Sequence, residues 1–148
     1  MKRYAQLQGR LVALRYKDRS SETTRETTEA RLIPDLGMEA DARGGPGPRQ
    51  LVLLAEEARR AINEARVPGL CYARFRENLL VAGIEPGELA PGTELRIGEA
   101  RIRISEARKR CYPECELPQG DCAIRAGVAF AEVLQGGTIH TGDEIRRA

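Results

Sequence analysis

The chain has 148 residues, a length that suits one domain and leaves little room for two. Hydrophobic residues make up 41% of it and charged residues 31%, a balance typical of a soluble globular protein. The 24 basic side chains barely exceed the 22 acidic ones, which argues against a dedicated nucleic-acid-binding protein.

The sequence shows neither a targeting segment nor a membrane span. The apolar run at residues 11–14 is too short for the core of a signal peptide. No stretch approaches the roughly 20 apolar residues that a membrane-spanning helix needs. We therefore expect a cytoplasmic protein with no membrane partner, in which the four cysteines are reduced thiols.

The beginning of the chain predicts one strand followed by a loop. Residues 4–16 alternate, with Leu11 and Ala13 on one face and Val12 and Leu14 on the other, so both faces are partly apolar. Residues 17–31 are rich in Ser, Thr, Glu and Arg and show no apolar stripe. We expect them to form a long, solvated and flexible loop.

A turn, a strand and a helix are expected next. Residues 44–48 (GGPGP) exclude regular structure, and the apolar run in residues 49–54 predicts a strand. Residues 55–66 have the periodicity of an amphipathic helix, which a Val-Pro-Gly sequence ends. The apolar face of this helix consists of Ala58, Ile62 and Ala65.

The second half of the chain predicts short strands separated by Gly- and Pro-containing turns. The clearest is a hairpin over residues 94–106, from which Arg101 and Arg103 face outward. Further apolar segments are residues 79–84, 127–134, 138–140 and 145. Many short strands and one good helix predict a single, mainly β, barrel-like domain over residues 1–148, with a few short helices.

Cys111 is the residue with the most suggestive chemical surroundings. Three basic residues directly precede it, and nearby positive charge favours the thiolate, the form that attacks sulfur and binds metals. This thiolate could carry a persulfide or coordinate a soft metal such as molybdenum. Cys115 and Cys122 lie in the same segment, residues 108–122, which has no regular periodicity and is expected to be a loop.

Other interpretations of the cysteines stay open. Cys71 follows a leucine and is expected to be a small, buried hydrophobic side chain. The three cysteines of residues 108–122 could hold a structural zinc ion, but they lack paired Cys-x-x-Cys spacing and would need His140 as fourth ligand. Two of them could also join in a disulfide. We expect His140 to be an exposed turn residue.

Several short motifs, taken in order, resemble the MOSC domain family. This module is found at the C-terminus of eukaryotic molybdenum cofactor sulfurase and in stand-alone bacterial proteins. The family's GLEGDAHGG is similar to residues 37–45 (GMEADARGG), its RQVSLL to residues 49–54 (RQLVLL), and its FGENL to residues 75–79 (FRENL). The Gly-Thr-x-Leu-x-Ile-Gly strand matches within residues 91–98.

The resemblance continues to the end of the chain. A bacterial pattern of Lys-Glu-Cys-His, then Cys, then Gly-Asp-Cys resembles residues 109–122, and the family's closing strands resemble residues 132–145. The chain departs from the family at five positions, and these bear on the ligand more than on the barrel. The departures are Ala40 for glycine, Arg43 for histidine, Val52 for serine, Arg76 for glycine and Tyr112 for histidine.

The resemblance implies a MOSC-type β-barrel of the stand-alone bacterial kind, with its reactive cysteine at Cys111. In cofactor sulfurases this domain is thought to bind molybdenum cofactor and receive sulfur, and in amidoxime-reducing relatives the matching cysteine is a molybdenum ligand. Pyridoxal phosphate belongs to the sulfurase's separate desulfurase domain, and no such site is expected in this chain. The implied partners are molybdenum cofactor or a sulfur donor protein.

The leading hypothesis is therefore a protein that binds molybdenum cofactor, carries sulfur, or does both, with sulfurtransferase-like turnover left open. The thiolate of Cys111 would hold a persulfide or ligate molybdenum, and Lys109 and Arg110 would support its ionised form. Cys115 or Cys122 would resolve the persulfide as a disulfide.

The cofactor itself would be held by charge and hydrogen bonds. The residues predicted to bind its anionic phosphate or polar pterin edge are Arg43, Arg49 and Asn78. One alternative is a non-catalytic accessory module that docks on a molybdoenzyme or a cofactor-biosynthesis protein. Another is a domain stabilised by zinc at the clustered cysteines.

Overall fold

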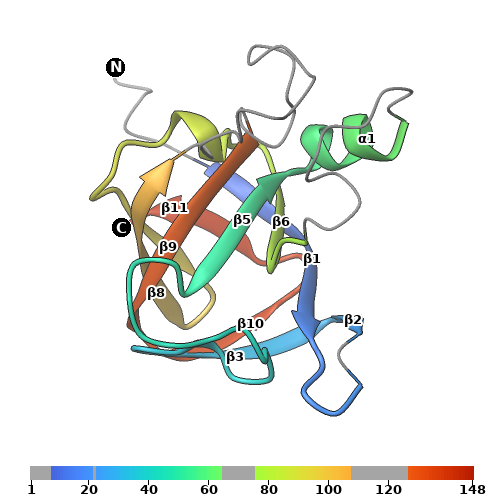
Figure 1. Ribbon diagram of the computed structural model, residues 1–148. Helices are drawn as coiled ribbons and strands as arrows, with labels where there is room; N and C mark the ends of the chain where they lie inside the picture. The colour runs from blue at the N-terminus through green and yellow to red at the C-terminus, as the bar shows by residue number, and fades with distance from the viewer. Residues whose placement is uncertain (1–7, 22, 65–75, 108–126) are drawn as a thin grey trace, which may run out of the picture.

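The computed structural model describes residues 8–21, 23–64, 76–107 and 127–148. These ranges consist mostly of strands, with one regular helix that follows β5 (Figure 1). Within them, no helix has the length and apolar character needed to cross a membrane. The elements are β1 (Gln8–Lys17), β2 (Thr24–Thr27), β3 (Glu29–Ile33), β4 (Gly37–Met38), β5 (Leu51–Ala55), α1 (Glu56–Glu64), β6 (Leu79–Ala82), the 3-10 helix η2 (Pro86–Glu88), β7 (Glu94–Ile97), β8 (Ala100–Ala107), β9 (Val128–Gln135), β10 (Gly137–His140) and β11 (Glu144–Arg147).

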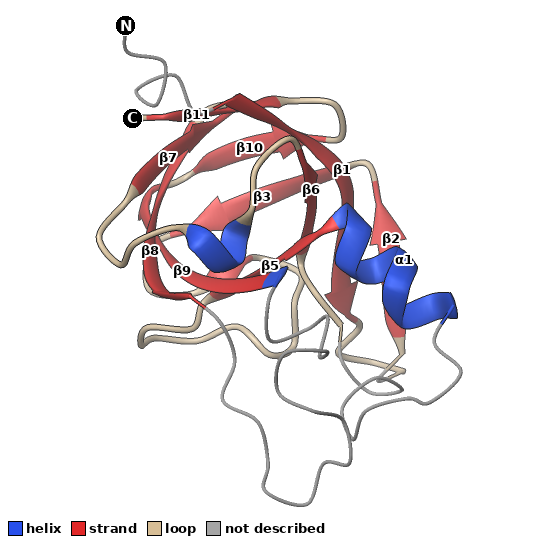
Figure 2. Ribbon diagram, turned by 90° about the horizontal axis from the view of Figure 1, so that it is seen from above, coloured by secondary structure: helices blue, strands red, loops and turns tan. Residues whose placement is uncertain are grey.

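Seven of the described strands form a closed barrel. Neighbours in its wall follow the order β11-β7-β8-β9-β5-β6-β1, and β1 pairs again with β11, with Gly9 opposite Ile145. These pairs are antiparallel except for β5 with β6. β2 extends the wall beside β1, while β10, β3 and β4 form a second sheet across one end of the barrel (Figures 1 and 2). This arrangement confirms the predicted mainly β, barrel-like fold.

The hydrophobic core has two parts because the strands near α1 are buried on both faces. The barrel interior is filled by one face of each strand, including Leu53 of β5 and Ala131 of β9. The opposite faces of β5, β6 and β9 pack under α1, where Ile62 meets the wall. Burial on both faces explains the nearly continuous apolar runs of these strands. The predicted helix and the predicted hairpin of β7 and β8 are both confirmed.

The structure corrects the prediction that residues 17–31 are a long flexible loop. β1 continues to Lys17, and β2 and β3 occupy half of the remaining stretch. β2 pairs with β1, and β3 pairs with β10 and β4, so main-chain hydrogen bonds order a sequence with few apolar residues. In β3 the buried side chains Ala30 and Leu32 alternate with exposed ones.

The predicted faces of β1 are also corrected. Its pairing with β6 shifts register between Leu11 and Ala13, which is the signature of a β-bulge. The bulge brings Leu11 and Leu14 to the same face, inside the barrel, and leaves Val12 and Ala13 on the outside against the α1 cluster. Strict alternation had assigned Leu11 and Leu14 to opposite faces.

Candidate functional site

A buried hydrogen bond joins two of the motifs identified in the sequence. Asp41 and Asn78 are both 2% exposed, and the Asn78 amide donates from Nδ2 to Asp41 Oδ2 at 2.9 Å. The same amide donates to the carbonyl of Arg15 at 3.2 Å and accepts from the Val52 N–H at 2.9 Å. Asp41 also accepts from the Lys17 N–H at 2.9 Å. Asn78 therefore ties β1, β5 and the loop after β4 to one another.

Glu77, the residue before Asn78, is a fully buried carboxylate between two arginines. Its side chain is 0% exposed and forms ion pairs with Arg15 of β1 and with Arg59 of α1, the latter at 2.5 Å. Arg15 also pairs with the exposed Glu26 at 3.2 Å. A buried carboxylate needs such partners, because removing one from water without compensation costs several kcal/mol. Glu77 thus fixes α1 to the barrel wall.

Arg49 lies two residues before β5, and its guanidinium is bound by the carboxylate of Glu106. Its Nε and Nη2 donate to the two carboxylate oxygens of Glu106 at 3.0 and 2.8 Å, and its guanidinium lies 4.2 Å from the ring centre of Phe130. The hydrogen bonds raise the pKa of Arg49 and lower the pKa of Glu106. The Arg49 side chain is still 53% exposed, so it can reach a further anion.

Arg43 is brought close to the buried network, whereas Arg49 is held by other partners. The Arg43 guanidinium lies 3.4 Å from Asp41 and donates to the carbonyl of Arg76 at 3.4 Å, while 37% of its side chain stays exposed. Asp41 therefore links the predicted site residues Arg43 and Asn78. Among the described residues, no hydrogen bond or ion pair connects either of them directly with Arg49.

The cysteine segment falls outside the described residues. The predicted site residues that lie there are Lys109, Arg110, Cys111, Cys115 and Cys122, as does Cys71. The described chain ends before this segment at Ala107, which pairs with Ala129 of β9. It resumes at Gly127, where a Cβ would lie 2.7 Å from the Cβ of Ala58 in α1. Both ends of the segment that contains Cys111 thus adjoin β9 or α1.

The described residues offer no alternative metal centre. Among them, no group of three or more His, Cys, Asp and Glu side chains is arranged to hold a metal ion. His140 is exposed at the end of β10, 3.4 Å from Glu29, as expected for a surface residue. The zinc hypothesis rests on the clustered cysteines, which lie outside these ranges, and stays a prediction.

Sequence reasoning did not single out several residues of the buried network. Asp41 and Glu77 lie in the two motifs that resemble the family, at residues 37–45 and 75–79, but the sequence alone assigns them no function. Their carboxylates within these motifs could have marked them as candidates. Arg15 and Arg59 carried no such signal. They come from a strand and a helix remote in sequence, and only the folded chain brings both to Glu77.

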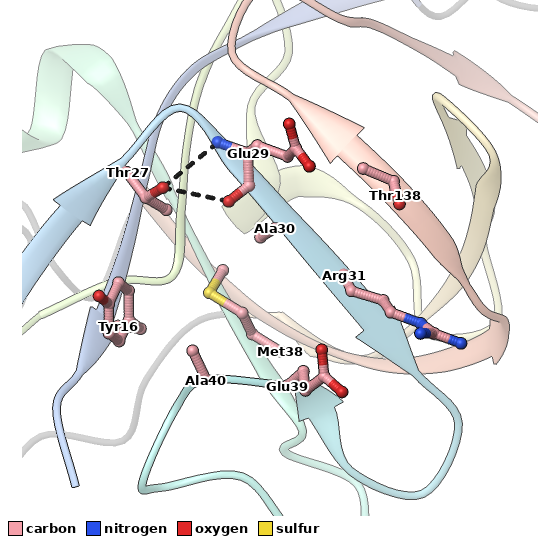
Figure 3. A pocket seen from close by; sticks show the side chains of 9 residues that line it. All are labelled: Tyr16, Thr27, Glu29, Ala30, Arg31, Met38, Glu39, Ala40 and Thr138. Carbon is pink, nitrogen blue, oxygen red and sulfur yellow. Dashed lines mark hydrogen bonds between the residues drawn. The ribbon is translucent and has the colours of Figure 1, made fainter.

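A separate open cavity of about 360 Å³ lies between β1, β3 and the chain after β4 (Figure 3). Tyr16 faces Met38 and Ala40 across it, and Arg31 and Thr138 contribute further lining. Ala40 stands where the family motif has glycine, so its methyl group belongs to the cavity wall. Neither Arg43, Arg49 nor Asn78 lines the cavity.

Comparison with known proteins agrees with this architecture. The YuaD protein of Bacillus subtilis superposes with a TM-score of 0.70 at 19% identity, covering 95% of this chain and 96% of that one. YiiM of Geobacillus stearothermophilus gives a TM-score of 0.62 at 16% identity, covering 95% of this chain and 75% of that one. YiiM of Escherichia coli gives 0.60 at 21% identity, covering 94% and 69%.

The family itself is established by sequence. No curated protein matches the chain. The model of the MOSC domain matches residues 40–146, a stretch that contains Asp41, Arg49, Asn78 and Cys111. Since this match covers most of the chain, and the fold agrees with the solved structures, the chain belongs to the MOSC domain family.

Proposed function

We propose that this MOSC domain binds molybdenum cofactor and carries sulfur on the thiolate of Cys111. The observation that carries the proposal is the basic sequence Lys109-Arg110-Cys111 inside the matched family region. Support comes from the end of β8, the barrel strand that directly precedes the segment containing Cys111. Glu106, the partner of Arg49, lies five residues before Cys111 in the sequence, and Arg49 is itself partly exposed.

The described residues fit an anionic cofactor in part. Arg43 and Arg49 keep 37% and 53% of their side chains exposed, so either guanidinium can bind a phosphate through two parallel hydrogen bonds. Asn78 is buried and its amide is engaged by the protein, so its contribution is to hold the Asp41 loop and, through it, Arg43. When bound, the cofactor supplies a molybdenum centre, for which a thiolate is a suitable soft ligand.

The sulfur-carrying step needs no external oxidant. The Cys111 thiolate attacks the outer sulfur of a donor persulfide, so that one S–S bond forms and another breaks. The donor leaves as its thiolate, and Cys111 becomes the persulfide. Lys109 and Arg110 favour the attacking thiolate over the thiol.

The direct test uses a persulfide generated by a cysteine desulfurase. After incubation, peptide mass spectrometry locates the added sulfur among the four cysteines, in the presence and absence of molybdenum cofactor. We expect the persulfide on Cys111, lost in Cys111→Ser, kept in the control Cys71→Ser, and blocked by cofactor. Equal labelling of Cys71 and Cys111, or none on Cys111, would refute the sulfur-carrying role.

One structural observation favours a second candidate, a non-catalytic module that docks on a molybdoenzyme or a cofactor-biosynthesis protein. Of the three described residues proposed for the cofactor, Asn78 is buried and Arg49 is already paired with Glu106. An unreactive Cys111 combined with retained cofactor or partner binding would select this candidate.

A further inference from the structure

Three arginines stand directly opposite one another on neighbouring strands of the barrel. Arg146 of β11 is paired with Arg96 of β7, and Arg96 is paired with Arg101 of β8. Each has a buried neighbour in its strand, Ile145, Ile97 and Ile102 respectively, whose side chain points into the barrel, so the three arginine side chains share the outer face. We call this row the arginine ladder. Uncharged Gln8 and Gln135 continue the row at its two ends.

The ladder departs from the charge pattern of the rest of the same wall. In the next row Glu94 lies opposite Arg103, and Arg103 lies opposite Glu132, with a 2.7 Å ion pair to the latter. There, opposite charges alternate from strand to strand, which stabilises a sheet. Like charges directly opposite destabilise it. The ladder places two such like-charged pairs side by side.

Neighbouring carboxylates of the described residues neutralise the positive charge of only two of the three arginines. Arg146 pairs with Glu144 at 2.6 Å, and Arg101 lies 3.4 Å from Glu94. Arg96, the central residue, is exposed and forms no ion pair with any residue in the described ranges. Features that break a local rule without internal compensation are expected at functional sites.

The ladder shares no residue with the proposed cofactor and cysteine site. β7 and β8 are on the side of the barrel opposite α1 (Figure 2). The inference is therefore independent of the proposed function, and either can fail without the other.

The surrounding charges select the kind of anion that fits. Glu94, Glu132 and Glu144 flank the ladder on both sides, and they would repel a continuous phosphate backbone. An extended acidic peptide can place carboxylates over the ladder and neutral residues over these glutamates. Strands in a sheet are about 4.8 Å apart, so the ladder spans roughly 10 Å. Alternate side chains of an extended peptide repeat at about 6.6 Å, within reach of long arginines.

We propose that the arginine ladder binds an extended, acidic segment of a partner protein. Each guanidinium offers a carboxylate two parallel hydrogen bonds, and Arg96 is the central contact because it has no carboxylate of its own in the described part of the chain. Binding relieves the repulsion between the three arginines.

The test is fluorescence anisotropy with a labelled peptide in which glutamate alternates with serine. The full chain should bind it in a salt-dependent manner, and should not bind a peptide with glutamine in place of glutamate. Arg96→Gln should weaken binding about tenfold, the loss of roughly one charge-assisted contact. Arg103→Gln, an equal change of charge in the neighbouring row, should change binding less than about twofold.

Thermal unfolding tests whether the arginines of the ladder repel one another, unlike the paired charges in the neighbouring row. Arg96→Gln should unfold at the same temperature as the parent or higher, whereas Arg103→Gln, which removes the ion pair to Glu132, should not gain stability. The proposal is overturned if Arg96→Gln binds the acidic peptide as the parent does. It is equally overturned if the two peptides bind alike, or if a single-stranded oligonucleotide of matched charge binds more tightly.

Discussion

The amide of Asn78 donates a 2.9 Å hydrogen bond to the carboxylate of Asp41, a residue 37 positions earlier in the chain. This contact connects the motif before β6 with the motif after β4. Together with the ion pairs of Glu77, it fixes the partly exposed Arg43 relative to the barrel wall. The two motifs are thus a single structural unit.

Replacing Asn78 with alanine should destabilise the fold by about 2–4 kcal/mol. The change leaves Oδ2 of the buried Asp41 carboxylate and the Val52 N–H without their hydrogen bonds from and to Asn78, and each unsatisfied buried group costs about 1–3 kcal/mol. Urea unfolding measures the difference. A loss below about 0.5 kcal/mol, typical of a surface position, would contradict the network described for Asn78.

Replacing Glu77 with glutamine should cost about 3–5 kcal/mol, because Arg15 and Arg59 would lose a buried counter-charge. Glu26→Gln is a matched control, since Glu26 also pairs with Arg15 but is 63% exposed. The control should cost at most about 1 kcal/mol. Equal effects of the two variants in urea unfolding would show that the burial of Glu77 is unimportant.

The ion pair of Arg49 with Glu106 predicts a pH-dependent contribution to stability. The pKa of Glu106 is lowered in the folded chain by the hydrogen bonds from Arg49, so the stabilisation is complete above the unfolded pKa of about 4.3. It is lost as the pH falls through the lower, folded pKa. Because both groups are partly exposed, Glu106→Gln should cost only about 0.5–1 kcal/mol at neutral pH.

The direction of this pH dependence is checked by measuring the free energy of unfolding of the parent and of Glu106→Gln at several acidic pH values. The difference between them should shrink below the unfolded pKa of Glu106. A difference that grows as the pH falls would contradict the lowered pKa. The same variant should raise the affinity of Arg49 for a small anion such as phosphate, because the competing carboxylate has lost its charge.

Gly37 should not tolerate a side chain. Its φ is 105°, and a Cβ would lie 2.3 Å from the carbonyl oxygen of Gln50. Gly37→Ala should therefore destabilise the protein by about 3 kcal/mol, through backbone strain and overpacking together. Gly45→Ala is the control, since a Cβ there meets nothing within 4 Å. Similar melting temperatures for the two variants would refute this difference.

The sequence predicts elements well where burial and periodicity coincide. The hairpin of β7 and β8 follows strict alternation, and α1 follows helical periodicity, so both could be placed from the residues alone. β2 has no buried residue, and its order depends on pairing with β1. No local apolar pattern could have indicated it.

Long-range features of the candidate site were harder to predict. The bulge after Leu11 depends on pairing with β6, and the role of Glu77 depends on arginines from β1 and α1. Asn78 and Arg49 lie within the residues that match the family model, and their predicted role stays a prediction. Their partners Asp41 and Glu106 are seen only in the folded chain. The arginine ladder likewise follows from strand register.

The reactivity of the Cys111 thiol tests the central claim most directly. Alkylation rates of the four cysteines, followed by peptide mass spectrometry at mildly acidic pH, report how much of each is thiolate. We predict that Cys111 reacts faster than Cys71 and that Lys109→Ala with Arg110→Ala removes the difference. A Cys111 that reacts no faster than Cys71 would contradict the proposal that it is a thiolate that carries sulfur.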